Sequence, residues 1–108
     1  METHTIKNVL IKADGEQIAS VPEATANLSI DRIEVTIDEV LLTKETIGLL
    51  SLTHTGKEFD VIGKVNDKTL IVKNSKINHL RFDAKKGEPV VLRDISILGL
   101  HARWDLEQ

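Results

Sequence analysis

The chain has 108 residues, a length that predicts one β-rich domain over residues 1–108 with a single modest core. Hydrophobic residues make up 41% of the chain but aromatic residues only 3%, so we expect an aliphatic core, which favours β structure. With 14 Lys and Arg against 17 Asp and Glu, the net charge of -3 lacks the basic excess that gives proteins most of their affinity for nucleic acid.

The sequence contains no cysteine, which excludes disulfides, thiolate metal sites and a cysteine nucleophile and fits a reducing compartment. Its start, METHTIKN, has no basic segment followed by an apolar one. No apolar run approaches the length needed to span a membrane. We therefore expect a soluble protein that is not exported.

The first predicted element is a β-hairpin. Asp14-Gly15 lies between the apolar runs 8–11 and 18–21, and Asp-Gly between alternating apolar residues is a strong hairpin signal because glycine accepts a positive φ. The polar residues KADGEQ around the turn separate the two runs. The sequence thus predicts two paired strands close to the amino terminus.

A period-two pattern follows in residues 24–37. Apolar residues occupy even positions from Ala24 to Ile30 and then odd positions from Ile33 to Ile37. Because a shift of one residue turns every side chain to the other face, a bulge or bend must lie near Asp31-Arg32. The pattern predicts either one long, bent strand or two short ones.

Residues 40–56, VLLTKETIGLLSLTHTG, fit two interpretations. Thr43 is a suitable cap for a short helix near residues 43–53 that ends at Gly56. Further threonines and the internal Gly48 weaken the helix, and Leu50 and Leu52 also suit a strand. We favour the helix.

Two more hairpins are expected in the second half. Residues 59–65 and 69–72 flank the polar turn Asn66-Asp67-Lys68, and residues 77–82 and 89–102 flank the loop DAKKGE. Short strands at this regular spacing predict a mainly β fold. We expect an antiparallel β-sandwich or barrel of about six to eight strands built from hairpins.

No pattern in the chain encodes chemistry. The four histidines, His4, His54, His79 and His101, do not form pairs at metal-ligand spacing, and no glycine-rich phosphate loop is present. The acidic residues between 31 and 45 alternate with apolar ones, as on the solvent face of a strand. We therefore expect no catalytic residue, no cofactor and no metal site.

The segment DISILG, Asp94–Gly99, matches the D-x-S-x-x-G element of PilZ domains, which bind cyclic dinucleotides. That family also uses an R-x-x-x-R motif, and no two arginines of this chain have that spacing. We interpret the match as coincidental. In this interpretation Asp94 and Ser96 point outward from a strand whose Ile95 and Ile97 point inward.

A second resemblance concerns the amino-terminal half. The segment DGEQIASVPEATANLSIDRIEVTI, residues 14–37, resembles the amino-terminal region of tail tube proteins of contractile-tailed bacteriophages. The segment LIVKNSKINHLRFDAKKGEPVVLRDISILG, residues 70–99, is similar to the strand, turn and strand that close such proteins. The resemblance implies a sandwich or barrel flanked by a helix, with subunits joined edge to edge in six-membered rings that stack into a tube.

The resemblance leads us to expect a self-assembling, non-enzymatic tail protein: a tube, tip or baseplate component. Its partners would be further copies of itself and other phage tail proteins, without recognition of a nucleic-acid sequence. It would belong to the virion and assemble in the host cytoplasm. The expected subunit interface comprises Asp14, Gly15, Ile18, Ile33, Val35 and Ile37.

The alternative is a small monomeric or dimeric β-barrel in the cytoplasm that binds a protein or a small ligand, as an adaptor or an inhibitor. It predicts a small mass in solution and one concentrated surface patch, for which the region of Trp104 is a candidate. The other interpretation of Trp104, the sole tryptophan, is an aromatic residue that caps the core.

Overall fold

A computed structural model describes residues 1–106, and its fold is mainly β, as the sequence predicts. The elements are seven strands and one helix: β1 (Glu2–Ala13), β2 (Glu16–Leu28), β3 (Ile33–Leu41), α1 (Ile47–Thr55), β4 (Phe59–Val65), β5 (Lys68–Asp83), β6 (Val91–Gly99) and β7 (His101–Leu106).

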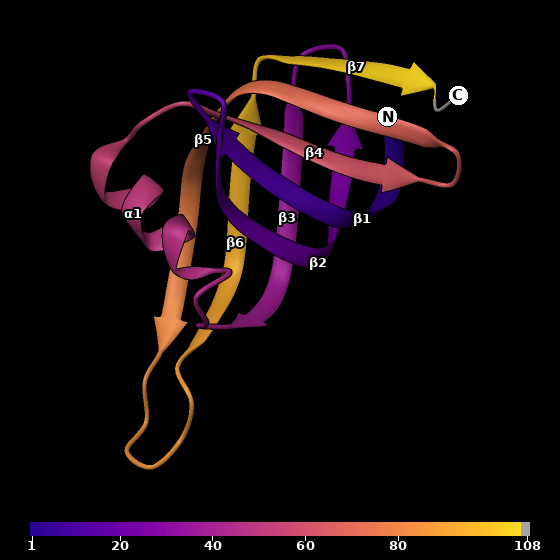
Figure 1. The fold of residues 1–108 in the computed structure, drawn as a ribbon. Coiled ribbons are helices and arrows are strands. Elements are labelled where there is room, and N and C mark those ends of the chain that lie inside the picture. The colour runs from indigo at the N-terminus through magenta and orange to yellow at the C-terminus, as the bar shows by residue number, and fades with distance from the viewer. Residues whose placement is uncertain (107–108) are drawn as a thin grey trace.

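Six antiparallel strands close into a barrel. The strand order is β4-β1-β2-β3-β6-β5, and the pairing of β4 with β5 completes the ring. β7 is an additional strand on β5, and the helix lies beside the barrel near β5 (Figure 1). Closure removes most of the free strand edges that an open sheet would expose.

The first hairpin is confirmed, with longer strands than expected. Asp14 and Gly15 both have positive φ, 53° and 79°, which is the conformation of a type I′ turn. β1 and β2 pair from the turn out to Glu2 and Leu28. The strand expected from Ala24 is therefore the second half of β2.

The change of face near Asp31-Arg32 is a reversal of the chain, so the interpretation as two strands is the correct one. β2 and β3 are joined by a turn in which the Ser29 N–H donates to the Arg32 carbonyl at 2.9 Å. The inward position expected for Ile30 is wrong. Ile30 lies at the tip of this turn and is fully exposed.

The helical interpretation of residues 43–56 is confirmed, although α1 begins at Ile47. Gly56, at φ 67°, ends the helix, and its N–H donates to the Leu52 carbonyl at 3.0 Å. Thr43 accepts hydrogen bonds from the backbone of the turn before the helix and does not cap it. The helix lies close to β2, because a Cβ on Gly48 would be only 2.1 Å from the Ile18 carbonyl oxygen.

β5 is one strand of 16 residues, where the sequence predicted two. Its first half pairs with β4 and β7, and its second half pairs with β6. Asn74 has a left-handed conformation at φ 53° and redirects the strand without ending it. Its amide side chain donates to Glu58 Oε1 at 3.1 Å, and its N–H donates to Asp60 Oδ1 at 3.3 Å.

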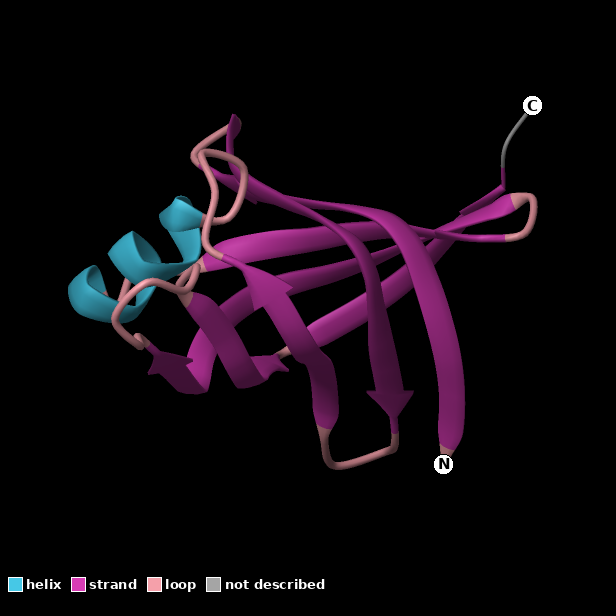
Figure 2. Cartoon of the chain, turned by 90° about the horizontal axis from the view of Figure 1, so that it is seen from below, coloured by secondary structure: helices cyan, strands magenta, loops and turns pink. Residues whose placement is uncertain are grey.

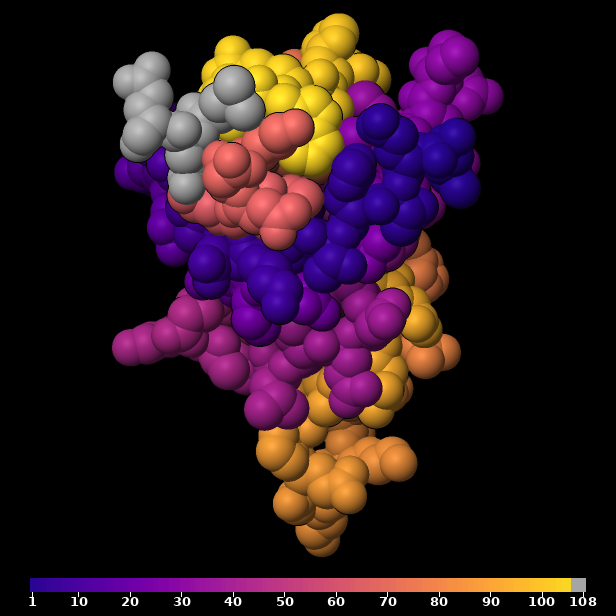
Figure 3. All heavy atoms as spheres, turned by 90° about the vertical axis from the view of Figure 1, so that its right-hand side faces the viewer, coloured from indigo at the N-terminus to yellow at the C-terminus, as the bar shows by residue number. Residues whose placement is uncertain are grey.

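The third expected hairpin is confirmed in β5 and β6, which project with their loop beyond one end of the barrel (Figures 1 and 3). The single strand expected over residues 89–102 is instead interrupted at Leu100, whose N–H donates to the Lys73 carbonyl at 3.1 Å. The chain therefore leaves β6 and continues as β7 on the first half of β5.

The core is aliphatic, as the composition predicts. Phe59 is the only aromatic residue among the buried hydrophobic residues of the described chain. The largest fully buried apolar side chains come from the helix and from five of the six barrel strands, all except β2: Ile6, Val9, Ile11, Val35, Leu49, Val61, Leu70, Val72, Leu92, Ile95 and Ile97. Figure 2, a view along the projecting hairpin, shows the helix at one side of this barrel.

Candidate functional site

The six residues of the expected interface do not form one surface. Asp14 and Gly15 are exposed at the tip of the first hairpin, and Ile18 is partly buried near the helix. Ile33 lies at the start of β3, opposite Leu28 at the far end of β2. Val35 and Ile37 are in the core, so their side chains pack within the subunit.

The tip of the first hairpin is already engaged within the chain. The Lys57 Nζ lies 2.5 Å from Asp14 Oδ2. The hydrogen bond and charge of Asp14 raise the pKa of Lys57 above its ordinary value. Asp14 therefore connects the first hairpin to the segment between α1 and β4.

The outer face of β3, β6 and β5 carries charged and polar side chains that are paired with one another. Arg93 contacts Asp83 at 2.5 Å and Glu39 at 3.0 Å, and these carboxylates raise its pKa. The Ser96 hydroxyl donates to Glu34 at 2.5 Å, while Ile95 and Ile97 are buried, as we expected for DISILG. These ion pairs and hydrogen bonds connect the outer faces of β3, β5 and β6.

The histidines lie on four different elements. In residues 1–106, no three His, Asp or Glu side chains lie close enough together to hold a metal ion. His54 is at the end of the helix, and His79 and His101 are exposed on β5 and β7. Among the ring contacts of the described residues, the one that involves a histidine joins His4 edge to face to Trp104.

β7 is the edge strand of the described chain. It pairs with β5 from Lys68↔Leu106 to Lys73↔His101 and has no neighbour on its other side among residues 1–106. Trp104 stands opposite the buried Leu70 and is 37% exposed, so it covers the core and reaches solvent. Residues 101–105 are all exposed.

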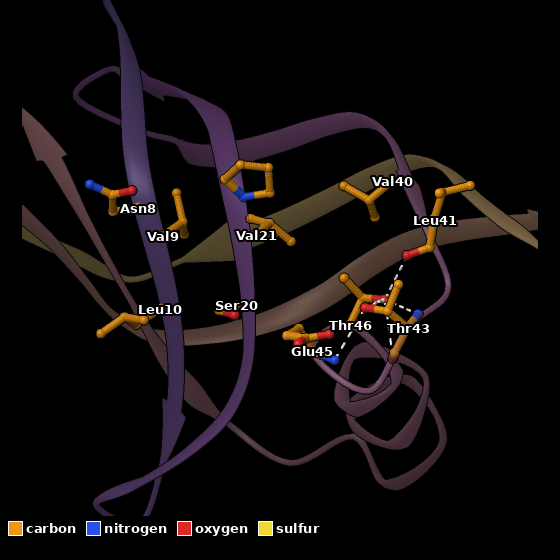
Figure 4. Close-up of a pocket in the computed structure, with 11 residues that line it drawn as sticks. Asn8, Val9, Leu10, Ser20, Val21, Val40, Leu41, Thr43, Glu45 and Thr46 are labelled. Atoms are coloured by element: carbon orange, nitrogen blue, oxygen red, sulfur yellow. Dashed lines mark hydrogen bonds between the residues drawn. The ribbon is translucent and has the colours of Figure 1, made fainter.

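An opening lies between β2 and β3, and we call it the wedge. The ladder between these strands has only four pairs, from Leu28↔Ile33 to Thr25↔Thr36, after which the strands separate. A cavity of about 450 Å³ occupies the gap (Figure 4). Its lining comes from β1, β2, the end of β3 and the following turn: Asn8, Val9, Leu10, Ser20, Val21, Pro22, Val40, Leu41, Thr43, Glu45 and Thr46.

The turn before the helix closes one end of the wedge. The Ser20 N–H donates to the Glu45 carbonyl at 2.8 Å, which attaches the turn to β2. The Thr46 hydroxyl donates to the Leu41 carbonyl at 2.7 Å and accepts from the Thr43 N–H at 2.8 Å, which attaches it to β3. Figure 4 shows these bonds between Leu41, Thr43 and Thr46.

Glu45 supplies a negative charge at this end of the wedge. A hydrogen bond from Thr43 and the backbone N–H of Glu45 itself lower the pKa of its carboxyl group. The side chain is exposed, and no cation lies within ion-pair distance of it in the described part of the chain. The wedge thus combines an aliphatic lining, two separated strands and an ionised carboxylate.

Sequence reasoning identified neither the free edge of β7 nor the wedge. The one local signal for the wedge was Pro22, because proline inside a strand marks an edge or a bulge. β7 gave no distinct signal, since its residues continue the apolar pattern of β6.

No family model, curated protein or solved structure matches the chain. None of the described helices has the length and apolar character required to cross a membrane.

Proposed function

We propose that the protein is a self-assembling structural protein whose subunits join through strand edges into rings, as a tube, tip or baseplate component of a phage tail or a related injection apparatus. The observation that carries the proposal is the free outer edge of β7. An edge strand presents a row of backbone N–H and C=O groups that can pair with another chain.

β7 lacks two of the features that prevent such pairing. Its sequence, HARWDL, contains neither proline nor lysine, and its oppositely charged residues Arg103 and Asp105 lie 3.8 Å apart. The described structure shows no further element over its outer edge. The free edge therefore supports association through β-sheet extension.

The architecture also supports the proposal. A barrel flanked by a helix is the arrangement that the resemblance to tail tube proteins implies, and the D-G-E turn that carries part of this resemblance is exposed. On this proposal the partners are copies of the same chain and other tail proteins, and the protein is a virion component assembled in the host cytoplasm.

The test combines light scattering over a concentration series with electron microscopy of the assemblies. Two proline variants, Ala102→Pro and Arg103→Pro, provide a matched pair. The N–H groups of successive strand residues point to opposite sides, so one proline removes a bond to β5 and the other removes an outward donor. Thermal unfolding identifies the variant that keeps its fold.

We expect the unmodified chain to form rings or tubes. The proline variant whose unfolding temperature equals that of the unmodified chain should lose this assembly. A mass that stays monomeric at every concentration contradicts the proposal. So does assembly that is equally strong in both variants.

The second candidate function is a small monomeric or dimeric module that binds a protein or a small ligand, and the wedge favours it. A cavity of about 450 Å³ lies in the range of ligand-binding pockets. This function predicts a mass that does not depend on concentration and saturable binding of a ligand at the wedge.

A further inference from the structure

We infer that the wedge between β2 and β3 is a docking site for an extended peptide segment with basic side chains, which joins the barrel as an additional strand. This inference rests on the second candidate function, whose ligand it specifies, and it does not require assembly through β7. It follows from three properties of the wedge: the strand edges without a ladder partner, the contacts that hold the two strands apart, and the charge of the side chains around it.

The first property is the pair of unpaired strand edges. β2 continues from Thr25 back to Glu16 and pairs there only with β1, and β3 continues from Thr36 to Leu41 and pairs there only with β6. Over residues 21–24 and 37–41 the facing edges therefore have no ladder partner. The backbone of an extended peptide is the ligand that satisfies such a row of donors and acceptors.

The second property is a frame that keeps the strands apart. Pro22 has no N–H to donate to a neighbouring strand, and it lies in the part of β2 that does not pair with β3. At the closed end, the bonds of Ser20 to Glu45 and of Thr46 to Leu41 hold the turn between the strands. Because these contacts are made within the chain itself, little ordering is needed for binding.

The third property is the chemistry of the lining and rim. Leu10, Val40 and Leu41 give the wedge an aliphatic surface, and Leu41 is 53% exposed at its mouth. Asp38 lies in the unpaired part of β3, and neither it nor Glu45 has an ion pair among the described residues. A strand that alternates aliphatic and basic side chains complements this surface.

The probe is an acetylated and amidated hexapeptide of alternating valine and lysine. One control peptide has glutamate in place of lysine, and another has proline in place of the central valine, which removes a backbone donor. Binding is measured by fluorescence anisotropy of the labelled peptides and located by amide hydrogen exchange of the ¹⁵N-labelled protein. The protein variants are Asp38→Asn with Glu45→Gln, and the matched control is Asp67→Asn with Glu88→Gln, which neutralises two exposed acids outside the wedge.

The expected result is saturable binding of the valine-lysine peptide, with slowed exchange of amides in residues 21–24 and 37–41. The variant at Asp38 and Glu45 should bind about three- to fivefold more weakly, because it loses two solvent-exposed ion pairs that are each weak in water, whereas the control variant should bind as the unmodified chain does. Both control peptides should bind more weakly than the probe.

Three results would overturn the inference. The first is a lack of saturable binding at peptide concentrations up to about 1 mM, because a dissociation constant above this value is too weak for specific recognition. The second is slowed exchange in β7 in place of the wedge. The third is slowed exchange in residues 21–24 and 37–41 that increases with protein concentration without peptide, because a second copy of the chain would then be the occupant. Ring assembly measured on the same samples reports separately on the proposed function.

Discussion

The rings of His4 and Trp104 meet edge to face, with their centroids 4.9 Å apart and their planes at 79°. This contact joins the start of β1 to β7, two segments from opposite ends of the chain. The Lys68 Nζ lies 6.0 Å from the Trp104 ring centre, and His4 Nε2 is buried without a hydrogen-bond partner among residues 1–106. Trp104 thus holds the edge strand against the barrel, consistent with its interpretation as a residue that caps the core.

His4→Ala should loosen this attachment. Loss of an aromatic pair lowers the free energy of unfolding by about 0.5–1.5 kcal/mol, and Trp104 should become more exposed. Because Trp104 is the sole tryptophan, a shift of its fluorescence emission to longer wavelength reports the change directly. His79→Ala, at an exposed position of β5, is the control and should leave the emission unchanged.

Gly48→Ala should destabilise the protein although alanine is the better helix former. The new Cβ would overlap the Ile18 carbonyl oxygen, and such overpacking lowers the free energy of unfolding by about 1–3 kcal/mol. Ser51→Ala, on the exposed side of the same helix, should be neutral or slightly stabilising. Urea denaturation of both variants distinguishes the effects, and equal stabilities would contradict the close packing of α1 on β2.

Thr46→Val should weaken the turn that closes the wedge. The Thr46 side chain is buried, and its hydroxyl bridges the Thr43 N–H and the Leu41 carbonyl. Valine keeps the shape but leaves both groups without this partner, at a cost of about 1–3 kcal/mol. Thr53→Val removes the hydrogen bond from the hydroxyl of an exposed residue to the Leu49 carbonyl and should cost less in the same denaturation experiment.

Leu92→Ala should be among the more destabilising single changes in the barrel. Leu92 is fully buried on β6, and truncation of a buried leucine lowers the free energy of unfolding by about 2–5 kcal/mol. Leu41 is more than half exposed on the neighbouring strand β3, so Leu41→Ala should have a much smaller effect. A similar loss for both variants, measured by urea denaturation, would contradict the assignment of Leu92 to the core.

Glu45 should make stability depend on pH in the acidic range. Its folded-state pKa is lowered, first by the hydrogen bond from Thr43, so the ionised carboxylate stabilises the folded state above the ordinary value of 4.5. This contribution is lost as the pH falls through the lowered pKa. The difference in unfolding free energy between the unmodified chain and Glu45→Gln should therefore be present at pH 7 and disappear at strongly acidic pH.

The control for this pH series is Glu88→Gln, in the exposed loop between β5 and β6. Its difference from the unmodified chain should change less over the same range. A Glu45→Gln difference that is constant from pH 7 into the acidic range would show that the carboxylate does not interact favourably in the folded state.

The sequence predicted the elements whose signals are local. Asp14-Gly15 specifies its own turn through the positive φ that it accepts, and residues 59–65 form a strand with the predicted bounds. The helix end at Gly56 was also predictable, because glycine takes the left-handed conformation there without strain.

The missed features depend on contacts between distant segments. The polar run around Asn74 has the composition of a turn, yet Asn74 redirects β5 because its bonds to Glu58 and Asp60 hold it against β4. Prediction of the wedge requires knowledge of where the ladder between β2 and β3 ends, and no local sequence pattern indicates this. Likewise, β7 is an edge strand only because of its place beside β5.

The position of β6 between β3 and β5 has a consequence for how the chain folds during synthesis. Strands β1 to β5 can pair through turns and through the contact of β1 with β4, but β3 and β5 meet only through β6, which ends at Gly99. The barrel therefore cannot close until the residues up to Gly99 have left the ribosome. Until then the nascent protein exposes the apolar faces and open edges of its first strands, so this small domain should depend on rapid completion or on chaperones to avoid aggregation.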